Sequence, residues 1–188
     1  MDTPKHKVNL RPLGDVLSFR NEIVHPRDQP RGQCTFVGLE HIQPNTGARV
    51  GSGSVLLEEL SGRRARFAQG DIVYGYLRPY LNKVWLAEFD GICSVDQYVL
   101  KPGSNVHPLY LAHFLRSSDF LRAAPIDNSP GQLPRIRSGE LTQTPIPLPP
   151  LDEQQRSRRS WSRPMICAAH DGLRSSGQTN SPSPSSTH

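Results

Sequence analysis

The sequence predicts a single mixed α+β domain with an antiparallel-rich sheet and one long helix, followed by a degraded or disordered tail. Short apolar segments separated by turn residues dominate the first 150 residues, and one segment near residue 115 has clear helical spacing. The composition changes sharply near residue 150. At 188 residues the chain has room for one domain with a short appendage.

Strand-forming residues gather in several short segments of the first hundred residues. Four segments predict strands, and they lie at residues 33–39, 71–77, 83–89 and 92–100. Residues 44–47 (Pro-Asn-Thr-Gly) predict a turn after the first of them. The spacers at residues 78–80 and 90–91 are short enough to join antiparallel neighbours.

Two segments predict helices. Residues 10–19 predict a short helix, with Pro12 in its first turn and apolar side chains on one side. Residues 108–124 predict the longest helix, because apolar residues recur there at helical spacing between Pro108 and Pro125.

The proline-rich residues 144–150 predict an extended connector, because proline lacks an N–H donor and fixes φ. Residues 151–154 then predict the first turn of a further helix. The chain beyond residue 155 is rich in Arg, Ser and Pro, so we expect roughly the last thirty residues to be disordered. The expected division is a domain at residues 1–150 and a helix start with a tail at residues 151–188.

The charge balance gives little support to binding through bulk charge. The net charge is +5, of which residues 1–152 carry +2 and residues 153–188 carry +3. The 18 arginines far outnumber the four lysines, so locally placed arginines would have to provide any binding to a polyanion. Since no apolar run could span a membrane and no apolar segment follows the N-terminus, we expect a cytoplasmic protein.

Patterns typical of catalytic or metal sites do not stand out. None of the four lysines follows a carboxylate at the spacing used by many metal-dependent nucleases. Residues 51–53 (Gly-Ser-Gly) lack the third glycine of a dinucleotide or methyl-donor loop, and the histidines show no metal-ligand spacing. Three widely spaced cysteines predict neither a disulfide framework nor a zinc site. We therefore predict no cofactor or metal bound by this chain.

Residues 67–87 predict a strand, a polar turn and a second strand. The turn carries Arg78, Tyr80, Asn82 and Lys83. Arginine and lysine can pair with phosphates or guanine edges, asparagine can read adenine, and tyrosine can stack or reach a phosphate. From the residues alone, an ordinary hairpin with a solvated polar tip is the favoured interpretation.

Five ordered segments together resemble a known family. They lie at residues 36–42, 67–87, 90–94, 131–136 (Gly-Gln-Leu-Pro-Arg-Ile) and 145–154 (Pro-Ile-Pro-Leu-Pro-Pro-Leu-Asp-Glu-Gln). From about Leu13 to Gln155 the chain resembles a target recognition domain of the specificity subunits of type I restriction-modification enzymes. Five motifs in register are far more specific than any one of them.

The resemblance implies a non-catalytic subunit that binds double-stranded DNA. In the family, each target recognition domain reads one half of a split sequence, and long helices hold two such domains apart. Those helices also dock the modification subunits, which carry S-adenosylmethionine and methylate adenine, while a separate restriction subunit cleaves with ATP. This chain has the equivalent of one domain. The resemblance therefore implies either that the chain pairs with a second copy or a second half-subunit, or that it is a fragment.

Three groups of residues are expected to contact DNA. The candidates are Arg63, Arg64 and Arg66 in a basic run, Arg78, Tyr80, Asn82 and Lys83 in the turn, and Gln132, Arg135 and Arg137 after the long helix. A solvated loop explains the basic run equally well. Arg78 and Arg135 belong to shared motifs and can serve the fold or generic phosphate contact, and Gln132 is as compatible with a turn.

Two other functions remain open from the sequence. The chain can be a non-functional or regulatory fragment that docks a methyltransferase subunit without specific DNA recognition, or a detached piece of a fused nuclease-methyltransferase. Because residues 156–188 lack a helical apolar pattern, we also predict a frameshift between Gln154 and Trp161. Reading one base earlier across Trp161 and Met165 restores several residues that suit a helix.

Overall fold

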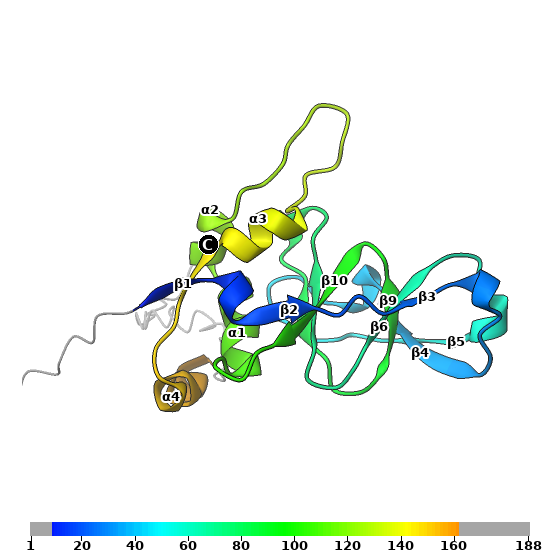
Figure 1. Ribbon diagram of the computed structural model, residues 1–188, viewed down its shortest axis with the longest axis horizontal. Coiled ribbons are helices and arrows are strands. Elements are labelled where there is room, and N and C mark those ends of the chain that lie inside the picture. The colour runs from blue at the N-terminus through cyan, green and yellow to red at the C-terminus, as the bar shows by residue number, and fades with distance from the viewer. Residues whose placement is uncertain (1–8, 162–188) are drawn as a thin grey trace, which may run out of the picture.

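The computed structural model describes residues 9–161, which form an elongated domain with helices at one end and a five-stranded sheet at the other (Figure 1). The strands are β1 (Leu10–Pro12), β2 (Leu17–Phe19), β3 (Ile23–Val24), β4 (Gln33–Val37), β5 (Gly53–Leu56), β6 (Arg64–Phe67), β7 (Ile72–Gly75), β8 (Val84–Leu86), β9 (Gly91–Ser94), β10 (Gln97–Pro102) and β11 (Pro145–Pro147). The α-helices are α1 (Pro108–Leu115), α2 (Ser118–Ala123), α3 (Ser138–Gln143) and α4 (Leu151–Trp161).

The strands form three sheets. A four-stranded sheet has the order β2-β10-β7-β8, a five-stranded sheet has the order β3-β6-β9-β4-β5, and β1 pairs with β11. Among the described strands, β4 and β9 form the one parallel pair, and the others are antiparallel. The predicted α+β class with an antiparallel-rich sheet is therefore confirmed.

The four-stranded sheet is buried on both faces. Along β7, Ile72 and Tyr74 belong to the core that contains helices α1 and α2, whereas Val73 belongs to the core shared with the five-stranded sheet. Along β8, Val84 and Trp85 divide between the same two cores. Because side chains alternate along a strand, one sheet can supply both cores, and such strands have nearly continuous apolar sequences.

The predicted helix at residues 10–19 is wrong. Residues Leu10–Pro12 form β1 against β11, and Leu17–Phe19 form β2 against β10. Between them the chain makes a single 3-10 turn at Leu13–Asp15, and the N–H of Leu13 donates to the Thr144 carbonyl at 2.9 Å. The apolar spacing that suggests a helix arises because this turn and the adjacent strand direct apolar residues into one core.

The predicted long helix is also wrong, because it is broken into α1 and α2. The Ser117 Oγ accepts a hydrogen bond from the Phe120 N–H at 3.1 Å, so Ser117 caps the start of α2. The rings of Phe114 and Phe120 meet edge to face across the break, with centroids 5.7 Å apart. Capping and aromatic packing at the break replace the continuous hydrogen bonding of one helix.

The predicted strand at residues 92–100 is two strands in different sheets. β9 lies in the five-stranded sheet and β10 in the four-stranded sheet, joined by a turn at residues 95–96. As predicted, β7 and β8 are antiparallel neighbours, but β8 and β9 lie in separate sheets despite their short connection. The chain therefore crosses between sheets at residues 87–90, where we expected a hairpin.

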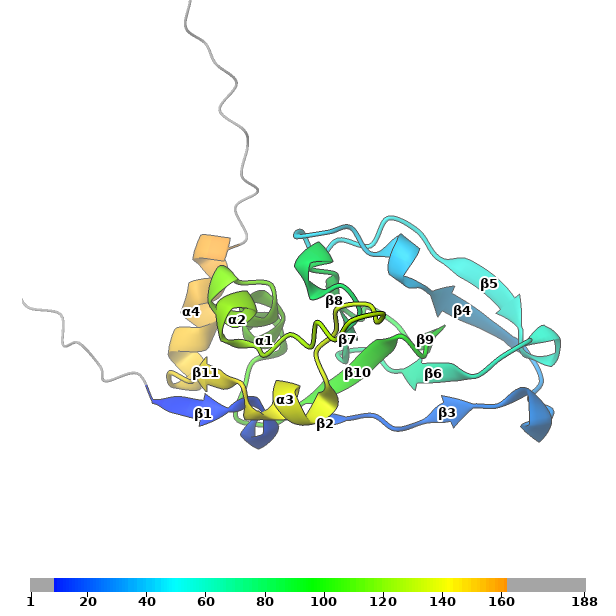
Figure 2. The same ribbon diagram turned by 90° about the horizontal axis from the view of Figure 1, so that it is seen from above.

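Helix α4 packs against α1 at the end of the domain where β1 and β11 pair (Figure 2). The Gln154 side chain is 2% exposed, and its oxygen accepts a hydrogen bond from the His107 N–H at 2.8 Å. Its Nε2 donates to the carbonyls of Pro149 at 2.8 Å and Asn105 at 3.3 Å. Helix α4 extends to Trp161, past the turn expected at residues 151–154, and the predicted tail lies outside the described residues.

We predict that Gln154→Leu detaches the root of α4 and lowers the free energy of unfolding by about 1–3 kcal/mol, because three backbone groups lose their hydrogen bonds to this buried side chain. Urea denaturation measures the stability, and hydrogen exchange measures the protection of the α4 amides. The control is Gln155→Leu, which makes the same change at the exposed neighbouring position. Equal protection of α4 in both variants would contradict the anchoring role.

Candidate nucleic-acid interface

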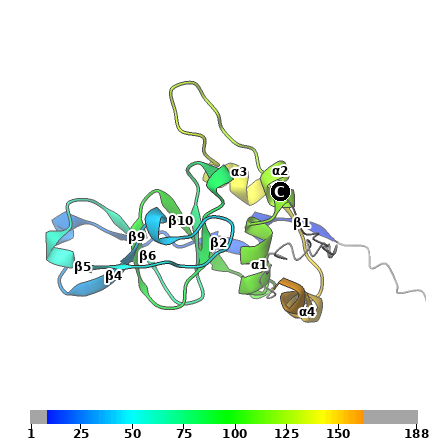
Figure 3. The ribbon, with the colours of Figure 1, turned by 180° about the vertical axis from the view of Figure 1, so that it is seen from behind.

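The turn between β7 and β8 lies beside the loop between α2 and α3. We call residues 76–83 the β7–β8 turn and residues 125–137 the projecting loop, because the loop extends away from the domain (Figure 3). The Arg78 N–H donates to the Pro134 carbonyl at 2.7 Å, and the Ile136 N–H donates to the Tyr76 carbonyl at 3.2 Å. Two of the three predicted groups thus form one surface.

The β7–β8 turn exposes Arg78 and Tyr80 on either side of the buried Pro79. A 3-10 helix at Pro79–Leu81 is flanked by Arg78 and Asn82, each with a φ of +50°. This left-handed conformation is uncommon for a residue such as arginine, so the surrounding contacts must hold it. The backbone bond from Arg78 to Pro134 is one such contact, and it ties this turn to the projecting loop.

Asn82 and Lys83 are used within the domain. Asn82 is 6% exposed, and its Nδ2 donates to Asn45 Oδ1 at 3.1 Å and to the Arg116 carbonyl at 2.8 Å. The Lys83 ammonium donates to the Leu39 carbonyl at 2.6 Å. Both side chains therefore have hydrogen-bond partners within the domain.

A half-buried polar cluster around Arg116 contacts the C-terminal end of the β7–β8 turn. The Arg116 guanidinium donates to the Val84 carbonyl at 3.3 Å and lies 3.1 Å from His113 Nδ1. Burial, with a smaller contribution from the Arg116 charge, lowers the pKa of His113 to about 4. A neutral imidazole at this position can accept the hydrogen bond from Arg116.

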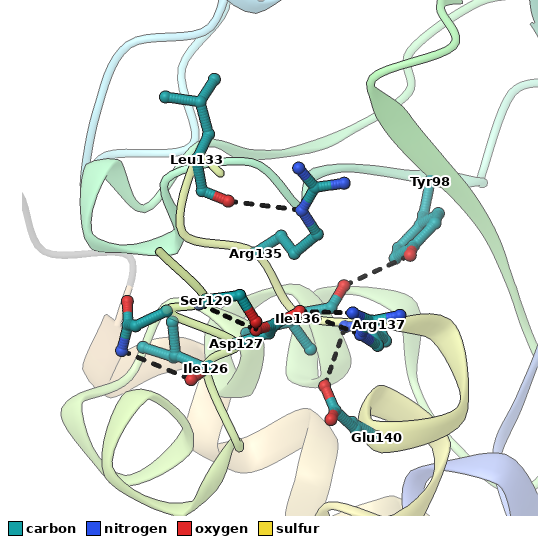
Figure 4. Close-up of polar contacts among 10 residues, drawn as sticks. Tyr98, Ile126, Asp127, Ser129, Leu133, Arg135, Ile136, Arg137 and Glu140 are labelled. Atoms are coloured by element: carbon teal, nitrogen blue, oxygen red, sulfur yellow. Dashed lines mark hydrogen bonds and ion pairs between the residues drawn. The ribbon is translucent and has the colours of Figure 1, made fainter. Parts of the chain in front are cut away.

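Arg135 lies beside a stacked pair of tyrosines. The rings of Tyr76 and Tyr98 stack with centroids 4.2 Å apart, and the Tyr98 hydroxyl donates to the Ile136 carbonyl at 3.2 Å. Arg135 Nε donates to the Leu133 carbonyl at 3.3 Å (Figure 4). Within residues 9–161 the structure shows no other hydrogen bond of this guanidinium, so its terminal donors can reach an external acceptor.

The tip of the projecting loop presents exposed side chains. Gln132 and Leu133 are both exposed, and Gly131 has a φ of +77°. The Gln132 N–H donates to the Ser129 carbonyl at 3.2 Å. Gln132 is thus part of a tight turn, as its alternative interpretation predicts, and its side chain is also accessible.

Arg137 forms an ion pair that the sequence did not reveal. Its Nε and Nη2 both donate to Asp127 Oδ2, at 3.0 and 2.6 Å, while the Ser129 hydroxyl and N–H donate to Asp127 Oδ1 at 2.5 and 3.0 Å (Figure 4). The Ser129 hydroxyl and the Arg137 guanidinium lower the pKa of Asp127 to about 2. Asp127 therefore stays ionised at neutral pH.

The basic run lies in and just before β6, which belongs to the five-stranded sheet. Arg64 and Arg66 belong to β6, so the alternative of a solvated loop is wrong for them, while Arg63 precedes the strand and is exposed. The Arg64 guanidinium lies 5.5 Å from the centre of the Phe36 ring. Arg66 is exposed and lines a cavity of about 410 Å³ together with Arg20.

Residues 9–161 lack the features of a metal site or a membrane-spanning helix. No group of three or more His, Cys, Asp or Glu side chains there can hold a metal ion. Over the same range, no helix is long and apolar enough to cross a membrane. Cys93 is buried, and burial raises the pKa of its thiol to about 12.

Comparison with known proteins decides the family. No family model matches the chain. The specificity subunit of the type I restriction enzyme EcoDI from Escherichia coli is 32% identical to it over 139 residues, or 74% of the chain. This chain carries a target recognition domain of a type I specificity subunit. It spans 30% of the length of that relative.

Solved structures of the family share the fold. A subunit of a type I restriction-modification complex matches the recognition domain with a TM-score of 0.70 and 25% identity, covering 85% of this chain and 42% of its own. The HsdS subunit from Thermoanaerobacter tengcongensis gives a TM-score of 0.72 at 24% identity, covering 85% and 43%. The S subunit from M. genitalium, at 14% identity, gives a TM-score of 0.51 and covers 85% and 40%.

We predict that Asn82→Ala destabilises the recognition domain by about 1–3 kcal/mol, because the hydrogen bonds of this buried side chain to Asn45 and Arg116 are lost and alanine is strained at a φ of +50°. The measurement is urea denaturation. Asn128→Ala is the matched control, since Asn128 is exposed on the projecting loop. Unchanged stability of the Asn82 variant would show that the cluster does not support the turn.

Proposed function

We propose that this chain is the non-catalytic specificity component of a type I restriction-modification complex and recognises one half of a split DNA sequence. The observation that carries the proposal is the 32% identity to a type I specificity subunit over 139 residues. Methylation of adenine and cleavage are assigned to partner modification and restriction subunits. A second half-subunit, or a second copy of this chain, supplies the other half of the recognition sequence.

The surface formed by the β7–β8 turn and the projecting loop supports this proposal. Its accessible side chains combine charge, an aromatic ring and hydrogen-bonding groups, which suit DNA recognition. Arg78, Tyr80, Gln132 and Leu133 are exposed, and Arg135 is half-buried with free terminal donors. We propose these five as the DNA-contacting set. Asn82 and Lys83 are left out because their polar groups are used within the domain.

The arginines in and just before β6 are proposed as additional phosphate contacts. Arg63 and Arg66 are exposed, and the structure shows no ion pair of either side chain within residues 9–161. Contacts to phosphate position a protein on DNA without reading its sequence. Arg64 is a weaker candidate because its guanidinium packs against Phe36.

Methylation mapping tests the proposal. A type I modification subunit from the same host is expressed with and without this chain, and methylated adenines are mapped along the host DNA. We expect a split sequence motif to be methylated only when this chain is present. Methylation that does not depend on the chain would overturn the proposal. Co-purification with the modification subunit without methylation would instead favour the regulatory docking fragment.

We predict that the proposed contacts divide into two classes in a DNA-binding assay. If the arginine contacts phosphate, Arg135→Gln or Arg78→Asn weakens binding to all sequences. Asparagine is chosen at position 78 because it tolerates a left-handed backbone conformation. Replacement of a base-reading residue instead weakens the binding free energy by about 1–3 kcal/mol on the recognised sequence alone. Fluorescence anisotropy with the mapped sequence and a random duplex separates the two outcomes.

The control for these variants is Arg122→Gln. Arg122 is an exposed arginine of α2 that pairs with Asp119 on the same helix, so its loss changes the net charge equally. An equal effect of Arg122→Gln and Arg135→Gln on both duplexes would contradict a local contact by Arg135.

A further inference from the structure

The projecting loop has a closed base and an open tip. At the base, the Asp127 N–H donates to the Arg135 carbonyl at 2.8 Å, and the Arg135 N–H donates to the Asp127 carbonyl at 3.1 Å. None of residues 128–134 is buried. With no apolar core beneath it, the tip depends on contacts at the base and on the backbone bond from Arg78 to Pro134 for its conformation.

The Asp127 carboxylate joins the two legs of the loop. It accepts four hydrogen bonds, of which two come from Ser129 on its own leg and two from Arg137 on the other leg. The Asp127 side chain is 14% exposed, whereas the Arg137 side chain is 61% exposed. Most of the carboxylate surface is therefore covered by the contacts that close the loop.

Arg137 lies on the C-terminal leg of the loop, and this leg is anchored in the core. The preceding residue, Ile136, is fully buried, and the Arg137 N–H donates to Glu140 Oε2 at 3.1 Å at the start of α3. In α3, Leu141 is also fully buried. The pair thus connects the leg at Asp127 to a leg that is fixed in the core.

We propose that Asp127 and Arg137 form a positioning pair that holds the projecting loop in its binding conformation and so places Gln132, Leu133 and Arg135 for DNA contact. The inference rests on the proposed function. It changes the role expected for Arg137 from direct contact to support. A loop that is already ordered does not lose conformational freedom on binding, so preorganisation raises affinity without any new contact.

The geometry favours support over direct contact by Arg137. Two of its donors converge on one carboxylate oxygen, and a phosphate at the same donors would compete with that carboxylate. An adjacent ionised carboxylate also repels phosphate. The positioning role gives both residues the same sign of effect on binding, whereas direct contact gives them opposite signs.

The test compares Asp127→Asn, Arg137→Gln and the double variant in the full chain, purified with its modification subunit. The probes are a duplex with the mapped methylation sequence and a random duplex of equal length. We expect each single variant to weaken binding to the mapped sequence by about three- to tenfold, and the double variant to be no weaker than the singles. Weakening by Asp127→Asn is diagnostic, because removing a negative charge near DNA would otherwise strengthen binding.

Three further measurements make the test specific. The slope of log affinity against log salt concentration stays unchanged for Arg137→Gln if the residue is not a phosphate contact. The reversed pair Asp127→Arg with Arg137→Asp restores part of the affinity. In the absence of DNA, amides of residues 128–135 exchange faster in Asp127→Asn than in the wild type.

Asp119→Asn is the matched control. Asp119 and Arg122 form an ion pair on the exposed face of α2, so this variant makes the same change of charge without opening a loop. We expect no loss of affinity and no faster exchange in the projecting loop. Thermal melting of every variant checks that the domain remains folded.

The outcomes separate this inference from the proposed function. If the wild-type complex prefers no sequence, the proposed function fails and the positioning role fails with it. If the wild type is specific but Asp127→Asn binds as tightly as the wild type, the positioning role alone is overturned. A reduced salt slope for Arg137→Gln together with unaltered Asp127→Asn would assign Arg137 to direct phosphate contact.

Discussion

Burial of the four-stranded sheet on both faces is the constraint on which the rest of the domain depends. β10 pairs with β2 on one side and with β7 on the other, and Val99 and Leu100 face opposite cores. One core contains the helices and the other contains the inner face of the five-stranded sheet. The turns that leave this sheet are therefore held rigidly, and the β7–β8 turn is one of them.

Two-sided burial also explains which elements could be predicted from the sequence. β7 and β8 could be predicted because strands that are apolar on both faces have continuous apolar sequences. The segment containing β1 and β2 could not, because Leu13 and Val16 show a helical spacing although they lie in and directly after a single 3-10 turn between two strands. The break at Ser117 depends on one hydroxyl and one ring contact, which apolar periodicity does not detect.

The candidate surface was predictable in part for a similar reason. Arg78 and Tyr80 could be selected because they lie in a short turn between two strands, where side chains remain accessible. Asn82 belongs to the same turn but is buried by Asn45 and Arg116, which lie far from it in the sequence. The partner of Arg137 was missed because it lies across a loop, and spacing alone does not show which residues of a loop face each other.

The hydrogen bonds at the start of α4 fix the angle between this helix and the rest of the domain. Because Gln154 bonds the helix to the backbone of residues 105, 107 and 149, the root of the helix is fixed to the rest of the domain. At a rise of 1.5 Å per residue, α4 acts as a lever of about 16 Å, and a tilt of about 10° at its root moves its far end by about 3 Å. That displacement is close to the spacing of one base pair, so under the proposed function a single buried amide would limit the angular error with which a partner bound to the helix places this domain on DNA.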